Sequence, residues 1–369
     1  PTKTVSSGKD IAFYCGAGKF LKHSVPWNPT ILKEKGVGGS EEAIIHLANG
    51  LAERGWKVTV FCVTGADRSA FYSKVEYSPY WLWNRSDCYD TVVVWRDPSH
   101  FDEPINARCK ILDLHDAIDS TWLTKERMSR ITRVSLKSLF HNTIVKVPTD
   151  RLQVIPNGIE WERFSERVER DPFMVLCTSS ADRCLSGALK VFRKVYEREP
   201  RARLYWAYGF GSLEGTSDPT IRGWLESTKR LLAETSGVIQ LGRVPQETLI
   251  EYYQRANVFL YPTKFPEIDC ISLTKAMAGG AYPVVSHCSA LAEKDAFGKQ
   301  IEPTEITAIE FKRIEYSIED ETVIDQFVEE VVHELHSPRT EEERHQMKEW
   351  AKRYDWSIII DEWEKRISD

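Results

Sequence analysis

The chain has 369 residues, enough for two domains of ordinary size, since a single domain usually has about 100–200 residues. Hydrophobic residues make up 42% and charged residues 28% of it, a globular composition that can fill two cores. Its 49 basic and 55 acidic residues give a formal charge of -6, so composition provides no general attraction to nucleic acid or to acidic membranes.

The cysteine pattern and the hydropathy of the chain bear on its compartment. None of the eight cysteines forms a Cys-x-x-Cys pair, and most lie in apolar strands or beside small residues, which indicates buried, reduced thiols. No charge-free apolar run approaches the roughly 18 residues that span a bilayer. No cleavable signal is visible at the start. We therefore expect a cytoplasmic protein, with a peripheral membrane contact left open.

The first half of the chain predicts alternating strands and helices. A helix should begin after Gly38-Gly39, with Ser40 as its cap, and end at Arg54-Gly55. Nearly continuous apolar runs suit parallel strands that are buried on both faces. These runs lie at Ile11–Cys15, Lys57–Val63, Thr91–Trp95, Ile111–Leu114, Ile131–Val134 and Leu152–Ile155.

The second half repeats the pattern after a charged stretch, Glu160–Pro172, which we interpret as an interdomain linker. Strands alternating with helices predict doubly wound parallel sheets, whose ligands bind beyond the carboxyl ends of the strands. The predicted strands are Phe173–Cys177, Arg203–Tyr208, Val238–Leu241, Val258–Tyr261 and Pro283–Val285. The predicted helices include Ile221–Ala233, Glu247–Ala256, Ile271–Ala278 and most of the tail from Glu321 to Ile367.

Two corners between a strand and a helix are candidate phosphate sites. Gly38-Gly39-Ser40 stands at a helix start, where free N–H groups and the helix dipole favour an anion, although a flexible loop with a cap explains it equally well. In the stretch from Ser179 to Arg183, the arginine offers a permanently charged fork for phosphoryl oxygens. The alternative is a surface Arg183 paired with Asp182.

Two further groups have both a functional and a structural interpretation. Leu114-His115-Asp116 follows a strand end, and the structural interpretation, Asp116 as a helix cap beside a partly buried His115, is the commoner one. Aromatic faces can stack on sugars, but core positions are more frequent for such residues. The aromatic group is Tyr72, Tyr77, Tyr80, Trp81 and Trp83.

The segment from Tyr261 to Gly280 combines two features that suit a sugar nucleotide. An apolar strand ends in a loop that carries Glu267 and Asp269, and a helix of small residues begins near Ser272. A carboxylate suits sugar hydroxyls, and a helix N-terminus suits phosphate. The alternative is a loop with solvated acids, which the small residues of the helix argue against.

Several chemistries lack their motifs in this sequence. No two Asp residues are separated by a single residue, so an Asp-x-Asp site for a metal-bound diphosphate is missing. No His-Glu-x-x-His, Walker loop or nucleophile elbow occurs. We therefore expect no metal and no cofactor beyond the substrate itself.

Taken together, these stretches resemble the glycosyltransferases of the GT-B fold, and specifically the large retaining family four. The resemblance is carried by Gly36–Glu41, Val154–Ile159 with its Ile-Pro-Asn-Gly-Ile run, Ser179–Arg183, Tyr261–Val285 and Tyr354-Asp355-Trp356. It implies two Rossmann-like parallel-sheet domains that face a cleft, with a C-terminal helix crossing back to the first domain. The implied domains are an acceptor domain, 1–165 with about 350–369, and a donor domain, 166–349.

The resemblance also implies a reaction and a set of site residues. A sugar would pass from a nucleoside-diphosphate sugar to a hydroxyl acceptor with retention and without a metal. The implied catalytic residues are His115 near the reacting carbon, Glu267 on the sugar hydroxyls and Arg183 on the diphosphate. The implied donor-binding residues are Gly38, Gly39, Ser40, Arg183, Arg243, Val244, Glu267, Cys270, Ile271, Ser272 and Lys275.

The sequence departs from the family at three places, which keeps two alternatives open. Lys275 stands where a ribose-binding Glu is usual, Ile268-Asp269-Cys270 replaces Gly-Phe-Gly, and Ser186-Gly187 replaces Lys-Gly. The alternatives are a sugar-nucleotide epimerase of the same fold and a non-catalytic module that binds a sugar nucleotide. The sugar, the base and the acceptor are not encoded in any of these motifs.

Overall fold

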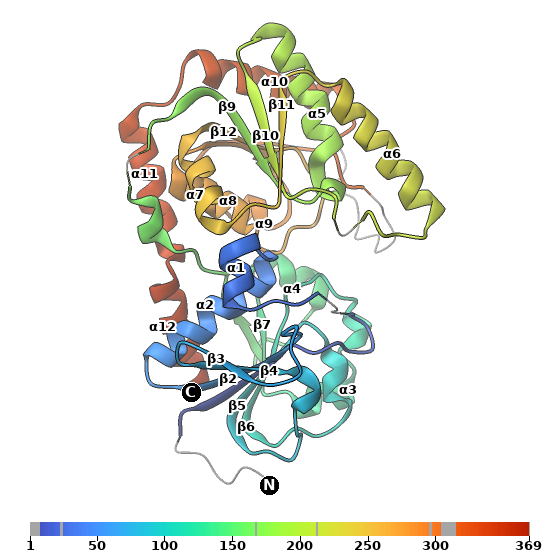
Figure 1. Cartoon of the computed structure of the whole chain (residues 1–369), viewed down its shortest axis with the longest axis vertical. Coiled ribbons are helices and arrows are strands. Elements are labelled where there is room, and N and C mark those ends of the chain that lie inside the picture. Colours follow the sequence, from blue (N-terminus) through green and yellow to red (C-terminus); the bar gives the residue numbers. More distant parts are fainter. Residues whose placement is uncertain are drawn as a thin grey trace. The chain divides into compact units, whose positions relative to one another are not determined.

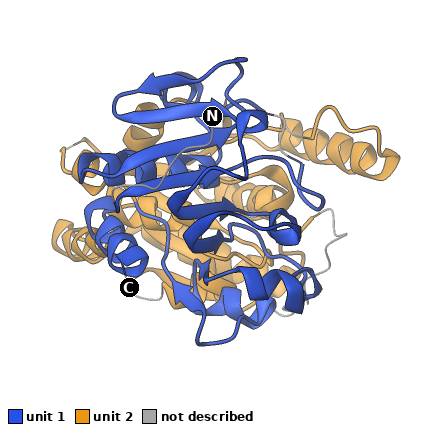
Figure 2. Cartoon of the chain, turned by 90° about the horizontal axis from the view of Figure 1, so that it is seen from below, with its two compact units in different colours: residues 1–158, 354–369 blue, residues 159–353 orange. Residues whose placement is uncertain are grey.

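The computed structural model describes residues 8–22, 25–166, 168–211, 213–294, 297–303 and 315–368. The chain divides into two compact units, which Figure 2 shows in different colours. Unit 1 comprises residues 1–158 and 354–369, and unit 2 comprises residues 159–353. The last segment of the chain therefore returns to the first unit. No helix in the described ranges is long and apolar enough to span a membrane.

Unit 1 is built on an eight-stranded sheet in which every pair is parallel except the edge pair β3–β4. The strand order is β3-β4-β2-β1-β5-β6-β7-β8, so the direction of winding reverses between β1 and β5. The strands are β1 (Asp10–Tyr14), β2 (Lys57–Cys62), β3 (Ala70–Tyr72), β4 (Val75–Pro79), β5 (Tyr89–Trp95), β6 (Ala107–Asp113), β7 (Arg133–Leu136) and β8 (Leu152–Val154).

Both faces of the unit 1 sheet are buried, as the continuous apolar runs predict. Successive residues of β1 and β5 alternate between two hydrophobic clusters, with Phe13 and Val93 in one and Ala12 and Val92 in the other. Helix α2 (Gly39–Glu53) and the returning helix α12 (Trp356–Ser368) cover the first cluster. The remaining helices of the unit are α1 (Pro29–Lys35), α3 (Lys125–Arg130) and α4 (Leu139–Val145), with short 3₁₀ turns at Tyr80–Leu82, Pro98–Asp102 and Ser120–Trp122, and a further one, Lys352–Tyr354, at the boundary with unit 2.

Helix α12 packs directly on α2 at a glycine. A β-carbon on Gly50 would lie 2.0 Å from Cδ1 of Ile360, so α2 needs the missing side chain at this position. A β-carbon on Gly158 would likewise lie 2.5 Å from Cδ2 of Trp356. These close approaches explain why the Pro156-Asn157-Gly158 turn and the Asp355-Trp356 start of the last helix belong to one packed region of unit 1.

Unit 2 is built on a six-stranded, fully parallel sheet in the order β11-β10-β9-β12-β13-β14. Numbered within the unit, this is the order 3-2-1-4-5-6 of dinucleotide-binding folds, with its switch point between β9 and β12. The strands are β9 (Asp171–Thr178), β10 (Arg203–Ala207), β11 (Val238–Gly242), β12 (Ala256–Tyr261), β13 (Tyr282–Ser286) and β14 (Lys299–Ile301).

Helices cover both faces of this second sheet (Figure 1). Helices α5 and α10 pack on each other and on β12, while α7 and α8 pack on each other from the other side. The helices of the unit are α5 (Ala181–Arg198), α6 (Pro219–Glu234), α7 (Gln246–Arg255), α8 (Ile271–Gly279), α9 (Ser289–Glu293), α10 (Glu321–His336) and α11 (Glu341–Ala351), preceded by a 3₁₀ turn at Trp161–Phe164.

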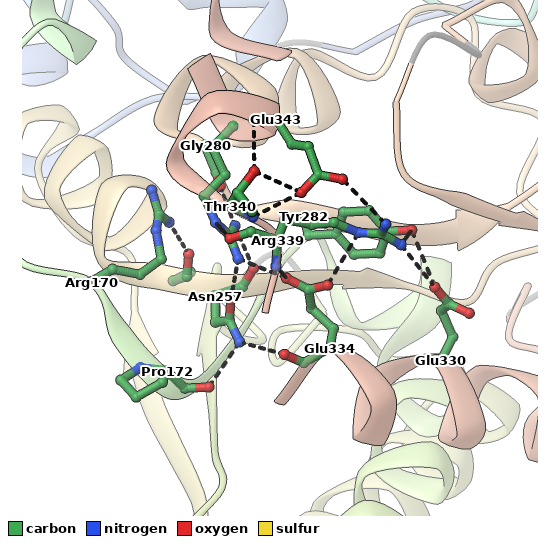
Figure 3. Close-up of polar contacts among 12 residues, drawn as sticks. Arg170, Pro172, Asn257, Gly280, Tyr282, Glu330, Glu334, Arg339, Thr340 and Glu343 are labelled. Carbon is green, nitrogen blue, oxygen red and sulfur yellow. Dashed lines mark hydrogen bonds and ion pairs between the residues drawn. The ribbon is translucent and has the colours of Figure 1, made fainter. Parts of the chain in front are cut away.

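A buried polar network joins α10 and α11 to the amino-terminal edge of the sheet (Figure 3). The Arg344 side chain, 2% exposed, donates to the Gly280 carbonyl at 2.6 Å and to Glu334 at 2.7 Å. The side-chain amide of Asn257 donates to the carbonyls of Pro172 and Glu334. Arg339 lies over the Tyr282 ring at 4.6 Å. The network lies at the amino-terminal ends of the strands, whereas ligands of such sheets bind at the opposite, carboxyl ends.

Three sequence-based expectations about the elements need correction. Ser40 does not cap α2: Gly38 is the N-cap and Ser40 lies in the first turn, because the helix already begins at Gly39. The stretch Glu160–Pro172 is no simple linker, since it holds the 3₁₀ turn and the first residues of β9. Strands β3, β4 and β14 were not expected; the first two are rich in aromatic residues and the third is only three residues long.

Candidate functional site

The site of unit 2 lies at the carboxyl ends of β9 and β12, the two strands at the switch point. Strand β9 ends at Thr178 and leads into α5, and β12 ends at Tyr261 and leads through a loop into α8. The Ser272 hydroxyl in the first turn of α8 donates to the Thr178 carbonyl at 3.0 Å. That bond fixes the start of α8 beside the end of β9, where ligands of such sheets bind.

Arg183 and Glu267 meet at this switch point. The Arg183 Nη1 donates to Glu267 Oε1 at 2.9 Å, and the Tyr261 hydroxyl donates to the same oxygen. The guanidinium also lies over the Phe265 ring, 4.3 Å from its centroid. Glu267 is 5% exposed, whereas the Arg183 side chain is 39% exposed. The carboxylate is therefore a buried support, and the cation reaches solvent at the edge of the sheet.

The charge states of this cluster follow from its surroundings. Burial lowers the pKa of Arg183, but the charge of Glu267 and its other neighbours raise it more, and the net shift is well upward. Burial raises the pKa of Tyr261 well above its usual value, and the Glu267 charge adds to the rise. The arginine therefore stays charged and the tyrosine stays protonated as a donor. The sequence alternative of an Arg183–Asp182 pair is replaced by Arg183–Glu267.

The loop before α8 is held by a buried ion pair. The Lys294 ammonium donates to Asp269 Oδ1 at 2.7 Å and to Thr274 Oγ1 at 2.8 Å, and both charged side chains are at most 5% exposed. Between them, Cys270 is the N-cap of α8 and has left-handed backbone angles of φ 60° and ψ 71°. Glycine is the usual residue in that region of backbone angles, because a side chain disfavours it. In this chain the Lys294–Asp269 ion pair holds the loop in which Cys270 adopts that conformation.

The first turn of α8 carries no side-chain cap from its N-cap residue. The amides of Ile271 and Ser272 therefore stand at a helix start, the arrangement that favours an anion. Lys275, one turn further, is buried at 5% exposure. The small residues of α8 have a packing reason as well: a β-carbon on Gly279 would lie 2.6 Å from the Tyr253 carbonyl carbon of α7.

Arg243 and Val244, also predicted to bind the donor, lie further along the same edge. Strands β10 and β11 end side by side, where the Tyr208 amide donates to the Gly242 carbonyl at 2.9 Å. Arg243 is exposed and lies over the Tyr208 ring at 4.6 Å, and Val244 is half-buried. The structure thus brings the predicted donor-binding residues of unit 2 to one edge of one sheet, from Arg243 after β11 to Glu267 and Cys270 after β12.

The predicted site residues of unit 1 lie at the corresponding edge of its own sheet. Gly38 and Gly39 start α2, and a β-carbon on Gly38 would lie 2.3 Å from Glu41 Oε2. Arg96, directly after β5, donates to Asp116 at 2.6 Å and lies 3.8 Å from Glu41. Asp116 is therefore an ion-pair partner of Arg96, which the sequence did not reveal.

His115 lies in a buried charged cluster, with its side chain 3% exposed. Its Nε2 lies 2.9 Å from Asp113 Oδ2, and the Lys137 ammonium donates to Asp113 Oδ1 at 2.6 Å. Burial raises the pKa of Asp113, but Lys137 and His115 lower it further, to well below its usual value. Burial and the Lys137 charge lower the pKa of His115. His115 is thus a neutral, oriented side chain, and its contact with a sugar stays a prediction.

Comparison with known proteins now adds to this geometry. No protein-family model and no curated protein matches the chain. Solved structures do, several of them over nearly its whole length, and three of these illustrate the likeness. A glycosyltransferase involved in avilamycin A biosynthesis, AviGT4, is 17% identical over 97% of this chain and 96% of its own, with a TM-score of 0.62.

The other two structures give similar values. Sucrose-phosphate synthase from Thermosynechococcus elongatus is 15% identical over 97% of this chain and 98% of its own, with a TM-score of 0.67. Anabaena HepE, solved with UDP and glucose, is 14% identical over 98% and 99%, with a TM-score of 0.65. The fold is GT-B. The predicted fold class, with its returning C-terminal helix, is confirmed.

Three residues of the clusters described above escaped the sequence analysis, one in unit 2 and two in unit 1. Tyr261, Asp113 and Lys137 each end or follow a strand at the carboxyl edge, and that position was the available signal. Tyr261 and Glu267 are 6 residues apart, and Asp113 and Lys137 are 24 residues apart, separations that no local pattern indicates. Within the described parts of the chain, no three His, Cys, Asp or Glu side chains are grouped so that they could hold a metal ion.

The aromatic residues divide into two groups in the structure. Tyr72 and Tyr77 pack edge to face, with Tyr77 fully buried, as the core interpretation predicts. Tyr80, Trp81 and Trp83 instead line a pocket, and Trp81 is 52% exposed. The core interpretation is therefore wrong for Trp81, because the chain after β4 turns out of the sheet as a 3₁₀ turn, whereas Tyr80 and Trp83 are partly buried against the hydrophobic cluster that contains Ala12 and Val92.

Proposed function

We propose that the chain transfers a glycosyl group from a nucleoside-diphosphate sugar to a hydroxyl acceptor. The observation that carries the proposal is the Arg183–Glu267 pair beside the start of α8, at the switch point of a sheet with dinucleotide-binding strand order. The GT-B fold, shared with glycosyltransferases, supports the same reaction class.

The residues of unit 2 suit the charges that such a transfer develops. Departure of the nucleoside diphosphate leaves negative charge on its oxygens, and Arg183 with the amides of Ile271 and Ser272 offers fixed positive partners. Glu267 receives both of its bonds at Oε1, so Oε2 faces no described hydrogen-bond donor and suits a sugar hydroxyl. Arg243, stacked on Tyr208, has a flat surface beside it for a base.

Two finer features belong to the proposal. Because a cation and helix amides of the chain itself would neutralise the diphosphate, we propose a transfer that needs no metal. We also propose retention of the anomeric configuration, on the basis of the resemblance to family four. Proton NMR of the fresh product, which distinguishes the two anomers, tests the second feature, and activity after treatment with a chelator tests the first.

The test of the reaction is Arg183→Ala with Arg193→Ala as its matched control. Both arginines lie on α5, but Arg193 is exposed and lies outside the site. Loss of one preorganised donor to a developing charge typically costs about 10²–10³ in kcat. We expect that loss for Arg183→Ala and wild-type turnover for Arg193→Ala. Near-normal turnover of Arg183→Ala at saturating donor would rule out its role.

A second experiment separates transfer from the two alternatives. Each sugar nucleotide of a panel is first screened by thermal shift, where a ligand at about 100 times its Kd adds roughly 2.7 kcal/mol of stability. The best donor is then incubated alone and with acceptors. An isomerised sugar in the absence of acceptor would identify an epimerase, and binding without turnover would identify a binding module. We expect Lys275→Met to weaken donor binding in calorimetry.

A further inference from the structure

Unit 1 contains a pocket of about 260 Å³ that the proposed donor site does not use. Its lining residues come from the ends of three strands or the segments after them: Tyr14 ends β1, Tyr80 to Arg85 follow β4, and His100 follows β5. Since β1 and β5 are the strands at which the winding of this sheet reverses, the pocket lies where parallel sheets bind ligands. Ile105 completes the lining.

Aromatic rings form most of the wall and are held in place by each other. The Tyr14 ring stands edge-on to Trp83 at 4.1 Å and to His100 at 4.7 Å. Trp81 stands edge-on to Tyr80 and leaves about half of its own surface exposed. A tryptophan this exposed adds little to a core, so its apolar face is available to a ligand.

Polar groups occur among these rings. The Arg85 side chain donates to the His100 carbonyl at 3.0 Å through one nitrogen and is still 36% exposed. The indole N–H of Trp83 is buried and has no hydrogen-bond acceptor among the described residues. Because an unpaired buried donor is costly, such a group is retained where a ligand or water oxygen satisfies it.

The loop after β1 is also shaped to leave this space open. A β-carbon on Gly16 would lie 2.7 Å from the Tyr14 hydroxyl and 2.8 Å from Cδ2 of Tyr80. His100 Nε2 lies 3.3 Å from the Gly16 carbonyl, and Asp97, fully buried, accepts the amides of Phe20 and Leu21. The wall is therefore fixed by hydrogen bonds rather than formed by a loose loop.

We propose that this pocket binds one pyranose ring of the acceptor, stacked on Trp81 and hydrogen-bonded by Trp83 and Arg85. A pyranose has an apolar C–H face and a rim of hydroxyl groups, which matches aromatic walls that carry fixed donors. The volume is below the ~300–1,000 Å³ of pockets that hold drug-sized ligands, so the pocket accommodates a single ring. That the bound pyranose is an acceptor rests on the proposed transferase function, whereas the binding of a pyranose in this pocket does not depend on it.

The test measures binding of methyl glycosides of glucose, galactose, mannose, N-acetylglucosamine and glucuronic acid to the full chain without nucleotide. Saturation-transfer NMR at millimolar glycoside detects binding, and titration gives Kd. Two variants probe the wall: Trp81→Ala removes the exposed face, and Trp83→Phe keeps a ring but removes the N–H. Phe71→Ala is the matched control, because Phe71 is an aromatic of the same unit, 71% exposed and outside the lining.

We expect at least one glycoside to bind. Trp81→Ala should then raise its Kd about five-fold or more, and Trp83→Phe about two- to ten-fold, with Phe71→Ala unchanged. Absence of saturation transfer from every glycoside overturns the inference, as does wild-type affinity in both wall variants. Donor binding, measured separately by calorimetry with sugar nucleotides, keeps the two proposals apart. If no sugar nucleotide binds but a glycoside does, the proposed transferase function is refuted and the pyranose site is still supported.

Discussion

The ion pair between Lys294 and Asp269 gives the sharpest test of how the loop before α8 is held. Its two atoms lie 2.7 Å apart and both side chains are at most 5% exposed. Removing one partner of such a buried pair typically costs about 3–5 kcal/mol, because the other charge loses its compensation in a low-dielectric site. We therefore expect Lys294→Met to lower the free energy of unfolding of unit 2 by about that amount, and Asp269→Leu likewise.

The double variant separates the ion pair from ordinary packing. With both charges gone, the remaining loss is that of the bonds that Lys294 makes to the Thr274 hydroxyl and to the Cys270 carbonyl, about 1–3 kcal/mol for the two together. The two single losses would sum to about 6–10 kcal/mol, so a double loss of about 1–3 kcal/mol implies a coupling of at least about 3 kcal/mol. Such a coupling is the mark of a direct pair.

The assay is scanning calorimetry with urea titration, because two units can unfold in separate transitions. Lys299→Met is the matched control, since Lys299 is exposed on β14 and its loss changes the net charge equally. Nucleotide affinity is measured on the same proteins, and we expect it to fall in Lys294→Met, because Cys270 loses the support of its left-handed conformation. A single loss below about 1 kcal/mol, or additive single losses, would refute the reasoning.

Three further outcomes follow from other parts of the structure. Arg344→Met should destabilise unit 2 by about 3–5 kcal/mol in calorimetry, since it removes the closer of the two arginines paired with the buried Glu334 and leaves the Gly280 carbonyl without this donor. His141 is fully buried and its pKa is lowered to about 4, chiefly by burial, so the unfolded chain takes up a proton first as the pH falls below about 6.5. The free energy of unfolding should therefore fall by about 3 kcal/mol between pH 6.5 and pH 4. In His141→Gln, the midpoint of urea unfolding should change less with pH over the same range than in the wild type. Gly50→Ala should cost about 1–3 kcal/mol by overpacking against Ile360, and Ile360→Val, which removes the clashing Cδ1, should restore part of it in thermal melts.

The sequence predicted the sheets well because both are buried on two faces. A strand such as β12 is buried at every position and apolar at all of them except Asn257, and its length and its flanking residues then separate it from a helix. Strands β3 and β4 do not give that signal, because β3 is an exposed edge strand and β4 is followed at once by aromatic residues that serve a pocket. The aromatic stretch therefore looked like core from its composition alone.

The location of the candidate site could be predicted from the sequence, but the hydrogen bonds within it could not. Strand order places the residues after β9 and β12 at one edge, so Arg183 and Glu267 could be expected in one site. Their mutual bond could not, because it depends on how far each loop reaches beyond its strand. The Lys294–Asp269 pair could not be predicted for the same reason. Lys294 follows a short helix, α9, and no feature of the sequence there indicates a contact with the loop before α8.

The Arg183–Glu267 bond also bears on how an anionic donor would be received. A guanidinium has five N–H donors, and Glu267 accepts from one nitrogen, Nη1, while the ring of Phe265 supports the flat face. The side chain keeps 39% of its surface exposed, so the remaining donors are open to a diphosphate without breaking the bond. Glu267 thus fixes the cation before a donor arrives, and the cost of ordering it is met in folding rather than in binding. Glu267→Gln keeps the shape of the side chain but weakens its bond to Arg183, so it should lower turnover and also the affinity for the free nucleoside diphosphate. If Glu267 contributed only a contact with the sugar, the affinity for the free nucleotide would be unchanged.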